Sequence, residues 1–113
     1  MFRPRVIPIL LLKDLGLVKT VSFDKSRYLG DPINAVKIFN DLEVDELIFV
    51  DISATPHNRM IPLKFVKEVG EEAFMPFAVG GGISSVAEAG DCIKNGAEKI
   101  ILDSHAVMNP NLI

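Results

Sequence analysis

Four apolar runs recur along this chain, and the stretches between them have the spacing of amphipathic helices. Within each run the apolar residues are continuous, whereas a strand with one solvated face would alternate apolar and polar residues. Continuous runs of this length indicate strands buried on both faces, the usual state of parallel strands that are joined by helices. The chain is therefore expected to fold as successive βα units, with strands at Arg5–Leu12, Glu46–Ile52, Pro76–Val79 and Lys99–Leu102.

The intervening stretches carry their own helix signals. Asp31-Pro32 joins a capping carboxylate to a proline suited to the first helical position, and predicts a helix ending near Leu42. A second helix is expected to begin near Pro62. A third is expected to begin at Ser84 or Ser85, because Ser85-x-x-Glu88 has capping-box spacing, and to stop at Asn95-Gly96. The residues expected to face the core are Ile33, Val36, Phe39, Leu42, Leu63, Val66, Val69, Val86, Ala89, Cys92 and Ile93.

Two further features favour a larger barrel. Residues 44–54 resemble residues 96–106, since each segment is a strand entered through an acidic residue and left through an aspartate. Such repetition suits a barrel built by duplication better than an open doubly wound sheet. Asn109-Pro110 then has the pattern of another helix start. Four parallel strands alone would leave two unpaired edges, so we expect the chain to be part of a larger barrel.

Composition excludes several classes of function. The 113 residues hold 12 Lys and Arg against 15 Asp and Glu, with no basic cluster or aromatic platform suited to nucleic acid. Val6–Leu12 is too short to span a membrane, and no small-residue cleavage site follows it. The single cysteine, Cys92, excludes an internal disulfide and is expected to be a buried structural thiol. We expect a cytoplasmic protein that binds neither nucleic acid nor membrane.

A glycine-rich turn is the main candidate binding motif. Residues 77–85 read FAVGGGISS, which is a short apolar strand, three glycines and a helix start. Glycines let the backbone turn tightly and expose its N–H groups, and a helix N-terminus adds a favourable dipole. This arrangement favours phosphate binding. The alternative is a plain βα turn with spare glycines.

Several motifs, in this order and spacing, resemble one known family. They are Arg5-Val6-Ile7-Pro8, Lys13-Asp14, Val18-Lys19, Gly30-Asp31-Pro32, Asp45–Ile52, Val79–Ile83 and Asn109-Pro110. Together they resemble the cyclase subunit of imidazole glycerol phosphate synthase (HisF), across essentially the whole chain but only the first half of that family's (βα)8 (TIM) barrel. Residues 1–113 would then be an α/β N-terminal half-barrel of four parallel βα units.

The resemblance also implies an activity. The family's enzyme, a lyase of histidine biosynthesis, receives ammonia from a glutaminase (HisH-like) subunit and closes an imidazole ring on a phosphorylated substrate. No cofactor and no metal are expected. The resemblance assigns Gly81, Gly82, Asp103 and Ser104 to a substrate phosphate, although the family usually has an amide where this chain has Asp103. A carboxylate there would repel a phosphate. Ser104 has the alternative role of a turn or cap residue.

The first strand departs from the family at Leu11, where HisF proteins carry a catalytic aspartate. Leucine cannot transfer a proton, and the second acid/base partner would lie beyond Ile113, so the chain by itself is expected to be inactive. A Leu-Leu-Leu first strand resembles the HisF-like branch that converts an acetamido group of surface-polysaccharide sugars into an acetamidino group. Asp51 and Lys19 are candidate substrate-positioning residues; the alternatives are a carboxylate accepting from loop N–H groups and a solvated lysine. His57 and His105 are interpreted as loop histidines.

Charged residues open three of the strands. Arg5, Glu46 and Lys99 would meet at the floor of a barrel if their faces point inward. They could form a solvated rim or a ring that holds the floor shut, whereas the resemblance implies a charged gate through which ammonia enters. Asp45 and Glu98 lie beside them and could face a docking partner.

Three hypotheses follow. The first is an ammonia-dependent synthase subunit that works with a glutaminase. The second is a non-catalytic half-barrel that associates with itself. The third is a different phosphate-binding barrel, such as a sugar-phosphate isomerase, that shares only the glycine turn.

Overall fold

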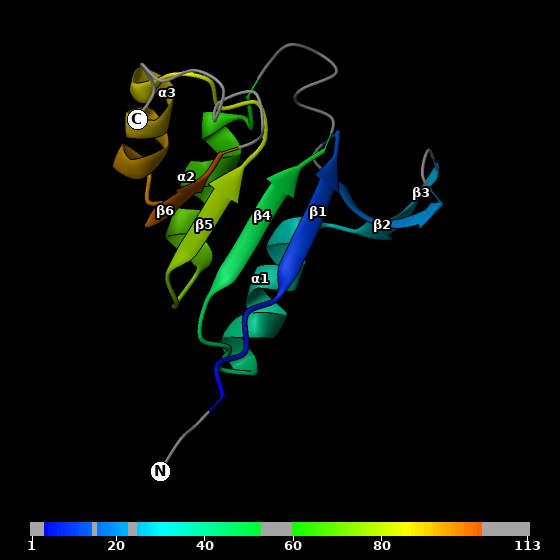
Figure 1. Cartoon of the computed structure of the whole chain (residues 1–113). Helices are drawn as coiled ribbons and strands as arrows, with labels where there is room; N and C mark the ends of the chain where they lie inside the picture. Colours follow the sequence, from blue (N-terminus) through cyan, green and yellow to red (C-terminus); the bar gives the residue numbers. More distant parts are fainter. Residues whose placement is uncertain (1–3, 15, 23–24, 53–59, 103–113) are drawn as a thin grey trace.

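The structure is a computed structural model, which describes residues 4–14, 16–22, 25–52 and 60–102. Its centre is a six-stranded sheet in the order β3-β2-β1-β4-β5-β6 (Figure 1). Four of these strands run parallel, namely β1 (Ile9–Lys13), β4 (Leu47–Asp51), β5 (Phe77–Gly80) and β6 (Lys99–Ile101). The α/β class and the four parallel strands expected from the apolar runs are confirmed.

The first strand begins later than its apolar run. Residues 5–8 still lie along the segment that leads into β4, because Val6 O accepts from the Asp45 N–H at 3.0 Å and Pro8 O accepts from the Ile48 N–H at 3.0 Å. Proline has no N–H to donate to a ladder, so a segment containing Pro4 and Pro8 pairs through its carbonyl groups and joins no regular strand before Ile9.

Residues 16–22 and 25–30 form two antiparallel strands in a part of the chain where the apolar runs predicted no strand. Strand β2 (Gly16–Ser22) pairs with β1, and β3 (Lys25–Gly30) pairs with β2. Val18, Thr20 and Val21 are β-branched, which favours extended backbone. The two strands also satisfy each other's backbone groups, so the segment needs no helix to support it.

Three helices cover one face of the sheet: α1 (Pro32–Asp41), α2 (Leu63–Glu72) and α3 (Val86–Lys94). Helices α1 and α2 lie behind β1, β4 and β5 in the view of Figure 1. Asp31 Oδ1 accepts from the Ile33 N–H at 2.9 Å, and Ser85 Oγ accepts from the Glu88 N–H at 3.1 Å. Both predicted caps are therefore confirmed, and each satisfies a backbone donor that the first helical turn leaves without a partner. Helix α2 begins at Leu63, next to the predicted start at Pro62, and its N-cap residue Pro62 forms no side-chain hydrogen bond.

The core lies between this helical layer and the sheet. Phe49 of β4 is fully buried and meets Phe65 of α2 edge to face, with ring centroids 5.4 Å apart. Such an edge-to-face pair adds to the free energy gained by burying two aromatic rings. Other members of the same core are Leu12, Val36, Leu47, Val66, Val69, Val79, Ile83 and Cys92.

Three residues expected in the core are exposed instead. Leu42 is 66% exposed because it is the C-cap of α1 and lies beyond the stripe that faces the sheet. Val86 and Ile93 are exposed on the outer flank of α3, at the edge of the helical layer. Within the described ranges no further helix packs against that flank. Ile33, Phe39, Leu63 and Ala89 are partly buried against the core, as expected.

The opposite face of the sheet is mostly apolar, with Lys99 at its amino end, and no helix of the described residues covers it (Figure 1). Strand register places Ile9, Ile48, Ala78 and Lys99 in one row, and Leu11, Val50, Gly80 and Ile101 in the next. Ile9 is 64% exposed, whereas Leu12 beside it on the helical face is fully buried. An apolar second face is typical of strands whose other side forms the interior of a barrel.

None of the helices that the structure describes is long and apolar enough to cross a membrane. The predicted fourth helix start at Asn109-Pro110 and the end of the second repeat, residues 103–106, lie outside the described residues.

Candidate functional site at the two ends of the parallel strands

The carboxyl ends of the parallel strands bring two of the predicted site segments together. Asp51 ends β4 between Leu12 of β1 and the glycine turn that follows β5. It is only 2% exposed. The structure therefore places Asp51 beneath the turn rather than on open surface, and its role in positioning a substrate stays a prediction.

The glycines of the turn are required by neighbouring strands. A Cβ on Gly81 would lie 2.7 Å from the backbone oxygen of Asp51, and Gly81 has a φ of +122°. A Cβ on Gly80 would lie 2.9 Å from the Cβ of Ile101. Real Cβ atoms do not approach other atoms so closely, so neither position tolerates a side chain without movement. Gly80 and Gly81 are therefore required by the packing of the strand ends, which is a structural role that a plain βα turn would share.

The turn also anchors the approach to α2. Gly81 O accepts from the Ile61 N–H at 2.9 Å, and Ile61 is fully buried. Gly82, with a φ of +68°, is half-buried. Among the described residues no backbone oxygen accepts a hydrogen bond from the Gly82 N–H. Phosphate binding at this turn stays a prediction.

The structure describes only some of the other residues predicted for the carboxyl ends of the strands. Leu11 is half-buried on the open face of the sheet, in register with Val50 of β4 and Val18 of β2, so its surroundings are apolar. Lys19 lies in β2 in register with Arg27 of β3. Asp103, Ser104, His57 and His105 lie outside the described residues.

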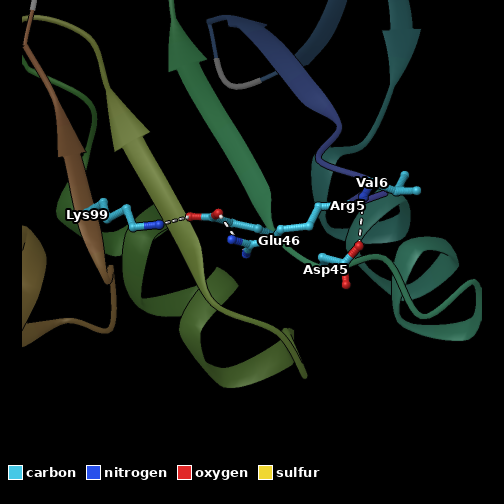
Figure 2. Close-up of polar contacts among 5 residues, drawn as sticks. All are labelled: Arg5, Val6, Asp45, Glu46 and Lys99. Carbon is cyan, nitrogen blue, oxygen red and sulfur yellow. Dashed lines mark hydrogen bonds and ion pairs between the residues drawn. The ribbon is translucent and has the colours of Figure 1, made fainter. Parts of the chain in front are cut away.

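A charged cluster occupies the amino ends of the strands (Figure 2). Glu46 Oε1 lies 3.0 Å from Lys99 Nζ, and Glu46 Oε2 lies 3.6 Å from Arg5 Nη2. The side chain of Glu46 is 5% exposed, whereas those of Arg5 and Lys99 are 62% and 56% exposed. A buried carboxylate is stable only when paired. Here Lys99 of β6 and Arg5, in the segment that precedes β1, supply that pairing. The three side chains converge; their role as a gate stays a prediction.

Asp45 has a contact within the chain that the sequence analysis did not foresee. Its Oδ2 accepts from the Val6 N–H at 2.6 Å and so fixes the segment that carries Arg5 (Figure 2). No spacing rule could have revealed this bond, because it joins residues 39 positions apart. Glu98 is exposed beside Lys99.

Cys92 has the character of a core residue. Burial disfavours the thiolate and raises the pKa of Cys92, and the nearby carboxylates of Asp91 and Glu88 raise it further. A raised pKa keeps the thiol neutral and a poor nucleophile. Across the described part of the chain, no group of three or more His, Cys, Asp or Glu residues is arranged to hold a metal ion.

Comparison with known proteins places the chain in a family. The model of the family described as "Histidine biosynthesis protein" matches residues 5–113. The chain belongs to this family. Members of the family are (βα)8 barrels, and the four parallel strands and three helices described above are part of such a barrel.

Individual relatives carry more specific names. The chain is 50% identical over all 113 residues to a Pseudomonas aeruginosa protein provisionally named imidazole glycerol phosphate synthase subunit hisF2, and covers 45% of it. It is 46% identical to a Leptospira borgpetersenii protein provisionally named as the HisF subunit, covering 44%. It is 42% identical to the imidazole glycerol phosphate synthase subunit HisF of Streptococcus mutans, covering 45%. The chain thus spans less than half the length of these curated relatives.

Proposed function

We propose that this chain is the ammonia-receiving half of a HisF-like synthase subunit, which uses glutamine-derived ammonia on a phosphorylated substrate. The observation that carries the proposal is the cluster of Glu46, Arg5 and Lys99 around a single buried carboxylate at the amino ends of the strands. Relatives named as synthase subunits support it.

The cluster suits a gate for a small neutral nucleophile. Glu46 makes one close contact, to Lys99 at 3.0 Å, and a longer one to Arg5 at 3.6 Å. Both cations are more than half exposed, so they can swing toward solvent without breaking the packing of the sheet. Beyond the cluster lie Ile9, Ile48 and Ala78, whose apolar side chains disfavour the ammonium ion and favour neutral ammonia. Ammonia would thus move along the open face toward the opposite end of the strands.

A glutaminase would dock at the same end as the gate. Apolar residues are exposed there in the segments that lead into the strands, namely Val6 before β1, Leu42 after α1 and Phe74 after α2. Phe74 is 87% exposed. An open cavity of about 290 Å³ lies beside Phe74 and is lined by Asn40, Glu43, Val44, Phe74 and Met75. Exposed apolar groups with a charged rim are typical of protein interfaces. Asp45 and Glu98 would belong to that rim.

The phosphorylated substrate would bind at the carboxyl ends of the parallel strands, where Gly81 and Gly82 form the turn after β5. Asp103 and Ser104, which follow β6 in the sequence, and Lys19 of β2 would be its further contacts. Leu11 favours a variant of the reaction. A leucine side chain offers no proton donor or acceptor at the position where ring closure would need one, and its cross-strand neighbours Val18 and Val50 offer none either, so amidination of an acetamido sugar is the second candidate.

The test separates ammonia delivery from the reaction itself. In the chain joined to the remaining strands of the barrel and supplied with a glutaminase, Glu46→Gln is expected to lower glutamine-dependent product formation about tenfold. This corresponds to about 1.4 kcal/mol. The rate with ammonium salt should change less than about twofold, because the substrate site is untouched.

Glu71→Gln is the matched control, because Glu71 is an exposed carboxylate of α2 and should leave both rates unchanged. A phosphate-binding isomerase would be insensitive to Glu46. If neither an imidazole precursor nor an acetamido sugar gives an ammonia-dependent product, the proposal is wrong.

A further inference from the structure

The helix that follows the glycine turn has an N-terminus that the chain itself occupies. Glu88 Oε1 accepts from the Ser84 N–H at 2.9 Å and from the Ser84 hydroxyl at 3.0 Å, while the Glu88 N–H donates to Ser85 Oγ at 3.1 Å. This is the reciprocal pairing of a capping box, with the carboxylate reaching one residue further back than usual. The negative charge that the dipole of α3 favours is therefore already supplied.

A phosphate on the turn would lie close to this carboxylate. Gly82 and Ser84 are two residues apart, so their nitrogen atoms are separated by at most about 7 Å. The two negative charges would be held at these two nitrogen atoms, so their separation is of the order of the Debye length at physiological ionic strength, about 8 Å, and salt only partly screens the repulsion. The Ser84 N–H is also unavailable to the phosphate while Glu88 holds it.

We infer that Glu88 is a specificity-determining residue of the glycine turn: it closes the N-terminus of α3 to ligands and weakens, through its charge, the binding of a phosphate at Gly82. This inference rests on the phosphate site of the proposed function and adds a residue that lowers the affinity of that site for phosphate. A doubly charged phosphate is penalised more than a singly charged one, because the repulsion grows with the charge of the ligand.

The decisive variant is Glu88→Gln, since glutamine also closes a capping box and only the charge is lost. Inorganic phosphate is titrated into the protein while the amide resonances of Gly82 and Ser84 are followed by NMR. The variant is expected to bind phosphate about 3- to 10-fold more tightly than the wild type. Asp91→Asn is the matched control, because it removes one exposed carboxylate from the same helix away from the turn, and its affinity should change less than about twofold.

The outcomes separate the two claims. If wild type and Glu88→Gln bind phosphate with the same affinity at Gly82, the role of Glu88 is refuted while the phosphate site stands. The same conclusion follows if the phosphate affinity of Asp91→Asn rises as much as that of Glu88→Gln. If phosphate leaves Gly82 unmoved in all three proteins, the phosphate site fails and the inference with it. A second measurement needs no variant: in the wild type, phosphate should shift the side-chain carboxyl resonance of Glu88 and leave that of Asp91 in place.

Discussion

Replacing Gly81 with alanine should lower the free energy of unfolding by about 3 kcal/mol or more, through backbone strain and overpacking together. An L-residue is strained at a φ of +122°, and its Cβ would lie 2.7 Å from the backbone oxygen of Asp51. Backbone atoms cannot rotate away, so the ends of β4 and β5 must separate. Urea denaturation measures the loss, and the amide resonance of Asp51 should move because its peptide group is displaced.

Two other glycines provide controls that separate the cost of backbone strain from the cost of the contact with Asp51. Gly30 has a φ of +141° and nothing within 4 Å of an added Cβ, so Gly30→Ala reports backbone strain alone, about 1–2 kcal/mol. Gly90 lies inside α3 with open space around it, so Gly90→Ala should stabilise the protein by about 0.5–1 kcal/mol. A Gly81→Ala variant no less stable than Gly30→Ala would show that the contact with Asp51 is not tight.

Truncating Phe49 to alanine should cost about 3–5 kcal/mol, the range for large-to-small changes of a buried aromatic residue. Phe49 is fully buried and packs on Phe65, so its loss leaves a cavity between β4 and α2. Part of the cost belongs to the ring pair: a double-mutant cycle with Phe65 should give a coupling of about 0.5–1.5 kcal/mol.

Ile9 provides the contrast on the other face of the sheet. Its side chain is 64% exposed, so Ile9→Ala should change the unfolding free energy by less than about 1 kcal/mol. Equal losses for Ile9→Ala and Phe49→Ala would mean that the open face of the sheet is covered in solution, which would support self-association. Light scattering on the wild type would then detect a dimer or larger assembly.

Much of the fold was predictable because its signals are local. Asp31-Pro32 and Ser85-x-x-Glu88 marked the starts of α1 and α3, since a cap needs only residues a few positions apart. The hairpin β2–β3 was missed, because nothing local shows that residues 16–22 pair along the edge of β1. Leu42, Val86 and Ile93 were misplaced for a related reason: periodicity gives a helix an apolar side, but neighbouring elements decide how much of it is covered.

The candidate site divides in the same way. Charged residues at the starts of the apolar runs pointed to Arg5, Glu46 and Lys99 as one cluster on the condition that their faces point inward, and the structure brings the three side chains together. The dependence of Gly81 on Asp51 could not be predicted, because it is a contact between neighbouring strand ends. The hydrogen bonds from Ser84 to Glu88 could not be predicted either, because the spacing Ser85-x-x-Glu88 indicates a carboxylate that accepts from the Ser85 N–H, one residue later.

The amino-acid sequence by itself determined the succession of strands and helices, the family, and which residues occupy the ends of the parallel strands. These follow from apolar patterning, caps and motif order, all of which act over short distances along the chain. Only the tertiary structure decided which carboxylates are free to act. Glu46 and Asp51 are buried among neighbours from other strands, Asp45 and Glu88 are engaged by backbone N–H groups, and Glu98 remains exposed. Burial and hydrogen bonding depend on which segments pack side by side, and that is settled only when the whole sheet has formed.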